Sequence, residues 1–365
     1  MPTIELNPAY DISQPTPVRV AVMGLPQGKL LLQPEGSGPA LPAQADGENA
    51  LVFIANNLKA GQPLRYRIET TLAETVGVRL QQDQGKLELH LPEGHCTTYH
   101  FGPDVIRPYL WPLYGPGQKR VTRSYPMAEQ AGETQDHPHH TSLWTAFDEV
   151  NGVNNWASEG KHGYTRHQDF VQQEQGPVFG GFTARSIWTD STDTPILNET
   201  RVVRLFNIGA QGRILDYTIT LAADYAAVEF GDTKEGGIIA IRVATSMDGA
   251  RGGLIKNAEG GRGEKECWGQ RATWCDYSGP VEGETLGIAV LDHPSNHNHP
   301  PRWHARDYGL MTANPLSNAA FIGGNPTPAT LQPGQSWTFY YRVLLHRGNA
   351  DAAGIKKAYQ AFAND

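Results

Sequence analysis

Short segments in which polar and apolar residues alternate recur along almost the whole chain. A period of two places successive side chains on opposite faces of a strand, whereas a helix needs a period near 3.6. The clearest segments also carry β-branched and aromatic residues, and they span 64–70, 86–92, 213–221 and 336–346. Gly, Pro, Asn and Asp bound them, as is typical of strands joined by tight turns. The pattern predicts an all-β protein.

Chain length and turn content narrow this fold class. The 365 residues include 40 glycines and 26 prolines, and they show no blade-like repeat. We therefore expect a large antiparallel β-sandwich over 96–365 that carries the site. Residues 1–95 are expected to form an N-terminal region of β-hairpins or a small accessory sandwich.

Two segments have more specific expectations. Residues 30–53 are rich in turn formers and indicate a long connection between two strands of the N-terminal region. Residues 349–365 place Ile355, Tyr359 and Phe362 at roughly helical spacing, which predicts a helix that caps the fold at the C-terminus.

The charge and the cysteines exclude several classes of partner. The net charge is −8 without a basic block, which argues against nucleic acid and against an anionic membrane surface. No apolar run approaches the roughly 18 residues of a membrane span, and the first residues lack a signal-peptide pattern. Cys96, Cys267 and Cys275 form no CxxC pair. We expect reduced thiols in a cytoplasmic protein.

Histidines concentrate in two loops that both begin with Asp-His-Pro. The first loop, 135–144, and the second, 292–309, hold seven of the thirteen histidines: His137, His139 and His140, then His293, His297, His299 and His304. Histidine suits proton transfer because its unperturbed pKa lies near neutrality. The two loops are therefore candidates for one site.

The first loop admits three interpretations. A metal-free polar site is favoured, and it requires no cofactor. A divalent metal such as zinc would take His137, His139 and His140 as candidate ligands, but no strict ligand spacing supports it. A structural loop that satisfies its own backbone is the third interpretation.

Polar residues also mark the segment 232–247. Glu235 precedes two glycines, which allow another group to approach closely. Alternation predicts two faces for the following strand: Ile239, Ile241 and Val243 on one, Ala240, Arg242 and Ala244 on the other. Arg242 is interpreted either as a ligand-binding residue or as the ion-pair partner of Glu235 on a solvated sheet.

Arginines and tryptophans flank the loops. Arg107, Arg120 and Arg123 lie in a proline-punctuated aromatic stretch before the first loop, either at the site or in solvent. Trp144 is interpreted as a sugar-stacking surface or as core. Trp303, in a proline-rich loop, is expected to be exposed at a rim.

The ordered motifs RPYLWPLYGPGQKRVTRSYP, DHPHHTSLW, DEVNGVNNW, TKEGGIIAIRVA, WGQRATWCDYSG and WHARDYGLMTANP resemble a bacterial family of unknown function labelled "methane oxygenase PmoA". The resemblance extends from about residue 100 to the C-terminus. A methane monooxygenase subunit is an integral membrane protein, so the lack of any predicted span excludes that activity. Members of the family accompany sugar oxidoreductases and sugar isomerase-like proteins, which implies carbohydrate catabolism.

A looser resemblance is to galactose mutarotase-like supersandwich proteins. These enzymes use a histidine and a glutamate as acid and base on a sugar in an open groove. The resemblance implies that His139 or His140 takes the histidine role and that Glu235 is a candidate carboxylate. The chain has no clear match to the C-terminal glutamate motif of mutarotases, so simple mutarotation is not implied.

These observations give one leading hypothesis. The protein is a carbohydrate-active enzyme that hydrolyses, eliminates or epimerises a sugar or an oxidised (keto) glycoside, and a small molecule or oligosaccharide is its partner. The predicted catalytic residues are His139, His140, Glu235 and His304. The predicted substrate-binding residues are Arg107, Asp136, Trp144, Arg242, Trp303, Arg306 and Asp307, with Asp136 also fixing a histidine tautomer. A non-catalytic carbohydrate-binding protein and a metal-dependent lyase or oxygenase remain the alternatives, and the oligomeric state is left open.

Overall fold

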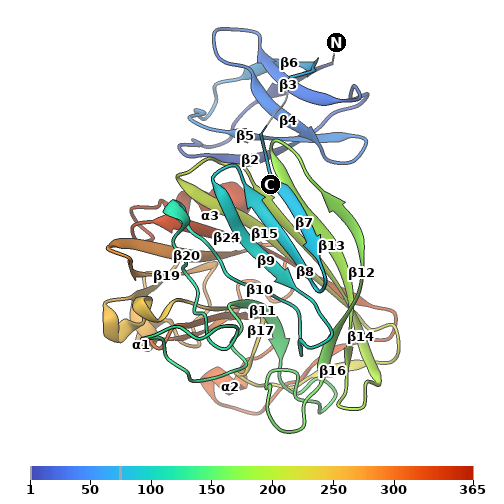
Figure 1. The fold of residues 1–365 in the computed structure, drawn as a ribbon, viewed down its shortest axis with the longest axis vertical. Helices are drawn as coiled ribbons and strands as arrows, with labels where there is room; N and C mark the ends of the chain where they lie inside the picture. The colour runs from blue at the N-terminus through green and yellow to red at the C-terminus, as the bar shows by residue number, and fades with distance from the viewer. Residues whose placement is uncertain (1, 74–75, 365) are drawn as a thin grey trace.

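Two eight-stranded antiparallel sheets form the main body, in a computed structural model that describes residues 2–73 and 76–364. The prediction of a large all-β sandwich is confirmed (Figure 1). Sheet I runs, in spatial order, β21 (Arg302–Arg306), β22 (Leu310–Asn314), β17 (Gly236–Arg242), β11 (Leu143–Phe147), β10 (Tyr109–Leu110), β9 (Gly94–His100), β8 (Lys86–Leu91) and β7 (Arg79–Asp83). Sheet II runs β12 (Tyr164–Glu174), β13 (Phe179–Thr189), β14 (Pro195–Phe206), β15 (Gly212–Ala222), β24 (Ser336–Arg347), β20 (Glu284–Asp292), β19 (Trp274–Val281) and β18 (Leu254–Asn257).

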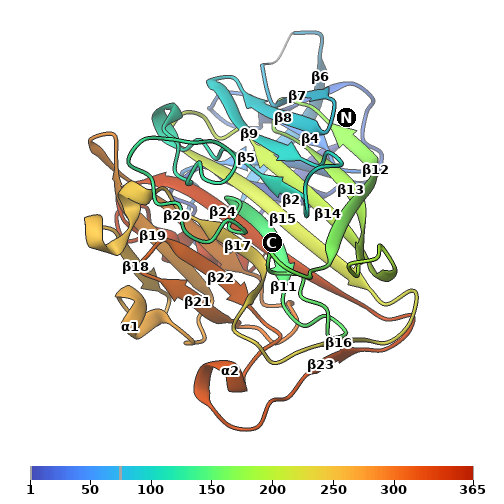
Figure 2. The same cartoon turned by 60° about the horizontal axis from the view of Figure 1, so that its bottom comes forward.

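The main core lies between the two sheets and follows the predicted alternation. On β15, Leu215, Tyr217, Ile219 and Leu221 all join the core. On β17, Ile239 and Ile241 do the same, while Ala240 and Arg242 face away from sheet II. Val243 lies in the core, as predicted. Ala244 was expected on the opposite face but also lies in the core, because the strand alternation stops at Arg242, where β17 ends. Figure 2 shows β21, β22, β17 and β11 side by side.

The N-terminal region is a six-stranded sheet that forms a lobe above the sandwich (Figure 1). Its order is β1 (Thr3–Leu6), β6 (Leu64–Thr71), β3 (Lys29–Pro34), β4 (Leu41–Ala45), β5 (Ala50–Ala55) and β2 (Thr16–Ala21). The expected long connection over 30–53 is wrong, because short turns join three paired strands there. Strands up to Thr71 pair within the lobe, and strands from Arg79 onward pair within the sandwich. Residue 95, where the boundary between the two regions was expected, lies inside β9.

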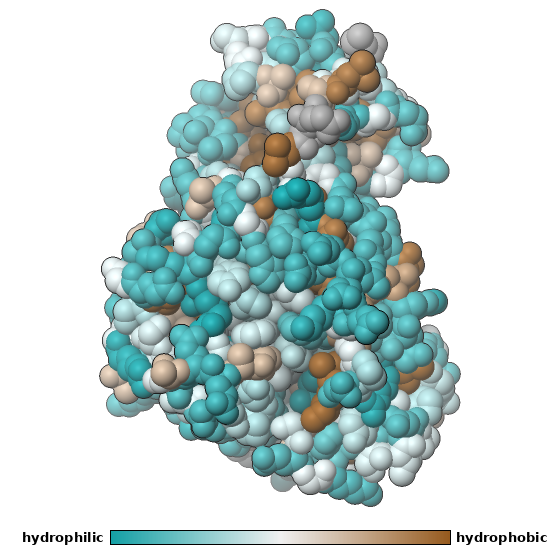
Figure 3. Space-filling model, viewed as in Figure 1, coloured by the Kyte–Doolittle hydropathy of each residue, from teal (hydrophilic) through white to brown (hydrophobic). Residues whose placement is uncertain are grey.

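Polar and apolar contacts join this lobe to sheet II. The Gln44 side-chain oxygen accepts hydrogen bonds from the backbone N–H groups of Val178 and Phe179, at 3.2 and 3.1 Å. Asp46 pairs with Arg204 at 2.6 Å. Val52 of the lobe packs in a buried cluster with side chains of sheet II. The surface seen in Figure 3 is mostly hydrophilic, with small separate hydrophobic patches.

Helices are few and short. They are α1 (Gly263–Cys267), α2 (Ala319–Ile322) and α3 (Ile355–Phe362), with 3-10 turns η1 (Pro116–Gln118), η2 (Thr245–Met247) and η3 (Gly249–Arg251); β16 (Val228–Phe230) pairs with β23 (Ala329–Leu331). The predicted C-terminal helix is confirmed as α3, which packs on Trp274 and Leu291 of sheet II. It begins later than predicted, after Gly354 in the left-handed region at φ 65°. Cys96, Cys267 and Cys275 are buried free thiols.

Candidate functional site

The first histidine loop covers the outer face of sheet I, the face that points away from the core. Beneath the loop, a row of directly paired residues crosses five neighbouring strands and forms the floor of the candidate site: His304, Thr312, Ala240, Trp144 and Tyr109. Their neighbours in sequence, such as Trp303, Ile239 and Leu143, enter the core instead. Strand alternation therefore brings the first loop, the segment around Glu235 and the end of the second loop to one face.

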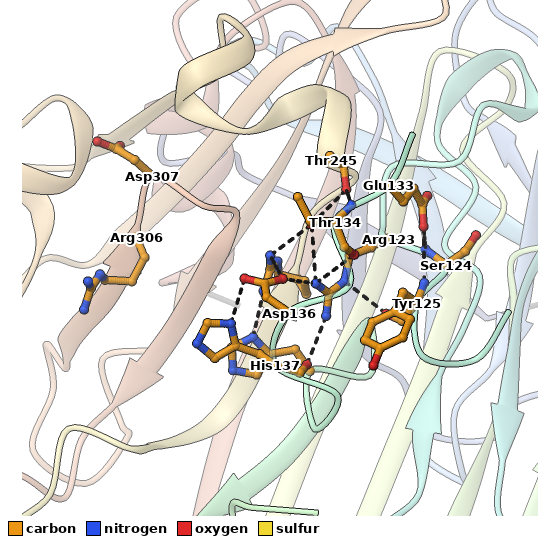
Figure 4. A network of polar contacts seen from close by, with 12 residues as sticks. Arg123, Ser124, Tyr125, Glu133, Thr134, Asp136, His137, Thr245, Arg306 and Asp307 are labelled. Carbon is orange, nitrogen blue, oxygen red and sulfur yellow. Dashed lines mark hydrogen bonds and ion pairs between the residues drawn. The ribbon is translucent and has the colours of Figure 1, made fainter. Parts of the chain in front are cut away.

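Asp136 holds the first loop to this face. Its Oδ1 accepts a hydrogen bond from Arg242 Nη2 at 2.7 Å and another from Arg123 Nη1, and its Oδ2 accepts from His137 Nδ1 at 2.7 Å (Figure 4). Both guanidinium groups are buried. Although burial by itself raises the pKa of Asp136, the charge of Arg242 and the hydrogen bond from His137 lower it to about 2. Asp136 is therefore a carboxylate at neutral pH.

Arg242 also fixes the protonation of His140. Its Nη1 donates a hydrogen bond to His140 Nδ1 at 3.0 Å. A guanidinium only donates, so Nδ1 has to be the acceptor and the proton of a neutral His140 lies on Nε2. Burial, with the charges of His139 and Arg242, lowers the pKa of His140 well below its usual value. His140 is a neutral donor with one fixed tautomer.

His137 lies between the two histidine-rich segments. Its ring stacks on His140 at a centroid distance of 4.8 Å and on Tyr308 at 4.9 Å. The guanidinium carbons of Arg242 and Arg306 lie 4.9 and 5.3 Å from the Tyr308 ring centroid. The His137 side chain is 40% exposed, so it can be reached from solvent. Its φ of 46° places a non-glycine residue in the left-handed region, which costs about 1 kcal/mol or more and is found preferentially at functional sites.

His139 points toward the other side of the loop. Its ring is perpendicular to that of His140, at a centroid distance of 4.5 Å, and lines a pocket of about 200 Å³ together with Arg107 and Tyr109. Burial, followed by the charges of Arg107 and His137, lowers the pKa of His139 to about 4. His139 is therefore neutral at physiological pH.

Glu235 and His304 occupy the other end of the row. The Glu235 side chain is 35% exposed and lies 3.1 Å from Lys234 Nζ. Its charge acts to raise the pKa of both His139 and His304. Burial nevertheless lowers the pKa of His304 to about 4, and neither ring nitrogen has a hydrogen-bond partner in the described part of the chain. The alternative ion pair between Arg242 and Glu235 is wrong, because Arg242 pairs with Asp136.

Three predicted substrate-binding residues contact other parts of the protein. Trp303 is fully buried and its indole N–H donates to Ala272 O at 2.8 Å, so the expectation of an exposed rim position is wrong; strand alternation on β21 turns it into the core. Trp144 is also fully buried, packed against Trp156. The Asp307 carboxylate accepts the backbone N–H of Glu264 at 3.0 Å.

The second histidine loop is divided between two places. Arg306, its Nε 2.8 Å from Glu264 Oε1, stands across from His137 in Figure 4. His293 packs against Phe362 and His297 stacks on Trp337, both beside sheet II. Only the β21 end of this loop therefore reaches the site.

The three candidate metal ligands pack on one another. The rings of His137 and His140 stack in parallel. The Nδ1 atom of His137 is bound to Asp136 and that of His140 to Arg242, so the ring nitrogens do not point to one shared metal position. Within residues 2–73 and 76–364, no group of three or more His, Cys, Asp or Glu side chains is arranged to hold a metal ion.

Sequence reasoning missed three residues of the site, Tyr308, Trp156 and Asp248, and it left Arg123 between site and solvent. Burial raises the pKa of Asp248 to about 6, although Arg242 acts to lower it. The Arg-Asp-Tyr-Gly sequence after His304 was a signal for Tyr308, but nothing local marks Asp248, which follows Arg242 by six residues.

Comparison with known proteins places the chain in a family of unknown function. None of the helices in the described chain combines the length and the apolar character that crossing a membrane requires. A search of curated proteins found no match. A family model described as "Family of unknown function (DUF6807)" matches residues 86–360, which include every residue of the site. The chain therefore belongs to this family.

Proposed function

We propose that this protein is a carbohydrate-active enzyme that works by general acid–base catalysis on the outer face of sheet I. The observation that carries the proposal is the Asp136–His137 pair. A carboxylate bound to Nδ1–H holds the imidazole in one tautomer, which leaves Nε2 to take a proton from a substrate. The exposure of His137 gives a substrate access to this atom.

Neighbouring groups supply the complementary functions. His140, held by Arg242, presents an Nε2–H donor, and Glu235 is a second, half-exposed acid or base. Arg306, 30% exposed beyond Tyr308, can hold a hydroxyl or a developing oxyanion. In this arrangement His137 takes the role that the sequence assigned to His139 or His140, and the buried His304 supports the floor.

A sugar is the substrate class that best fits these groups. Hydrolysis, elimination and epimerisation of a sugar or keto-glycoside all need one group that removes a proton and another that returns it. The similarity to mutarotase-like supersandwich proteins, which place such groups on the open face of a sheet, supports the same class. A non-catalytic sugar-binding role is less supported, because the aromatic faces of Trp144 and Trp156 are buried.

The test is a substrate screen that compares the wild type with one variant of His137. Purified protein is incubated with free aldoses and keto-glycosides in D2O and followed by NMR, which separates bond cleavage from deuterium exchange at carbon. We expect turnover in the wild type and its loss in His137→Gln. Full turnover by a folded His137→Gln variant would overturn the assignment.

A further inference from the structure

A pocket of about 200 Å³ lies beside the proposed catalytic group, where His139 lines its wall. Tyr109, Thr141 and Arg107 also line it, and Asp104 and Ser158 are among its other residues. His139 joins it to the site, because its ring also contacts those of His137 and His140. A molecule in the pocket would therefore lie next to a substrate of His137.

Arg107 is the unusual feature of this pocket. Its residue exposure is 3%, and its only hydrogen bond within the described residues is from Nη2 to Ala157 O, at 2.6 Å. No carboxylate of the described chain pairs with it, and no aromatic ring lies under its guanidinium. Burial alone lowers the pKa of Arg107 to about 10, with no acidic group acting against it. A buried charge without a counter-charge costs several kcal/mol, so an anion would be strongly favoured here.

A second observation concerns Thr141. Its hydroxyl oxygen is buried and has no hydrogen-bond partner in the part of the chain that the structure describes. Beside it, His139 is neutral and offers an N–H, and both residues line the pocket together with Arg107. Asp104 is exposed to solvent, which screens its charge from an anion bound at Arg107.

We propose that this pocket binds the carboxylate of an acidic sugar, so that the enzyme acts on uronates or uronate-containing glycosides. This inference rests on the proposed function, since it places the sugar ring between Arg107 and His137. The planar guanidinium matches the two oxygens of a carboxylate, and the Thr141 hydroxyl supplies a further donor. A single guanidinium beside neutral donors fits one negative charge better than the two of a phosphate.

Binding measurements test the pocket without requiring turnover. Calorimetric titration of the full-length protein with glucuronate and with glucose should show glucuronate binding at least about 10-fold more tightly, as one charge-assisted pair would give. Arg107→Gln should abolish this preference, and the control Arg185→Gln, which alters an exposed pair with Asp169, should retain it. Equal binding of the two sugars by the wild type, absence of saturable glucuronate binding, or tighter binding of glucose 6-phosphate would overturn the proposal.

A second variant covers the risk that Arg107→Gln fails to fold. Thr141→Val has nearly the same shape and removes a hydroxyl that has no protein partner, so the fold should be unaffected. We expect glucuronate binding to weaken about 3-fold or more and glucose binding to stay unchanged. An unchanged affinity for glucuronate would contradict the pocket's role.

The two proposals fail in different ways. If the pocket is wrong but the catalytic site is right, a neutral sugar is turned over and glucuronate shows no preference. If the catalytic assignment is wrong but the pocket is right, His137→Gln keeps both its turnover and its preference for glucuronate.

Discussion

The same tripeptide, Asp-His-Pro, opens both histidine loops, yet the two loops have different environments. In the first, Asp136 is partly exposed, and two buried arginines keep its pKa near 2. In the second, Asp292 is fully buried and accepts hydrogen bonds from His299 and Asn296. Burial raises the pKa of Asp292, although the hydrogen bonds from His299 and Asn296 act to lower it. The Asp-His-Pro sequence therefore does not determine the pKa of its aspartate. The charged groups that the sheets place beside the aspartate determine it.

The largest expected difference between the loops is in catalysis. His137→Gln should lower kcat/KM for the sugar identified by the screen by about 100- to 10,000-fold, the usual contribution of a general acid or base. His297→Gln in the second loop, where the ring stacks on Trp337, should leave kcat/KM unchanged. Steady-state kinetics measure both, and equal losses in the two variants would contradict the comparison.

The next difference is in stability. Arg242→Met removes donors from both Asp136 and His140 in a buried network and should lower the free energy of unfolding by about 3 kcal/mol. Arg306→Met removes a partly exposed pair with Glu264, which is worth less than about 1 kcal/mol, and a contact with the Tyr308 ring. Urea unfolding measures both losses. A larger loss for Arg306→Met would show that the network does not hold the first loop.

A smaller effect is expected in the second loop. His299→Ala leaves the buried Asp292 with one hydrogen bond fewer and should lower the free energy of unfolding by about 1–2 kcal/mol, without changing turnover. Urea unfolding and the sugar assay together check this. A loss of turnover at unchanged stability would instead place His299 in the site.

The last expected effect, absent at neutral pH, is a pH dependence of stability. The pKa of His304 is about 4 in the folded protein and 6.5 in a free side chain, so folding favours the neutral ring. Its contribution is complete above pH 6.5 and is lost as pH falls toward 4. Between pH 6.5 and 4, the unfolding free energy of His304→Gln should decrease less steeply than that of the wild type, by about 1 kcal/mol per pH unit. Urea titrations across this range measure the slope, and identical slopes in wild type and variant would refute a buried neutral His304.

Much of the fold followed from local pattern. Alternation at 213–221 and 336–346 identified β15 and β24, and helical spacing at the C-terminus identified α3. The same reasoning failed at 30–53, because strands as short as β4 carry few alternating residues between their turns. Trp303 was misplaced for a related reason: its neighbouring prolines indicated a loop, while β21 begins directly after them.

The candidate site was recognised only in part. Histidine density and the Arg242 strand pointed to the outer face of sheet I, and Asp136 was expected to orient a histidine. The partner, His137, was expected only as a metal ligand, since nothing in the loop shows which ring is exposed. Tyr308 was missed because its proximity to Arg242 depends on the pairing of β17 with β22. Asp248 was missed because nothing in the sequence around it marks a site residue.

The sequence by itself determined the all-β class, the two faces of β17 and the histidine-rich segments, because these depend on residue periodicity and composition. Only the tertiary structure decided that Arg123 and Arg242 meet at Asp136, that His137 faces solvent, and that Arg107 is buried without a counter-charge. These properties arise from contacts between strands far apart in the chain, and such contacts set the desolvation and charge interactions that define a site.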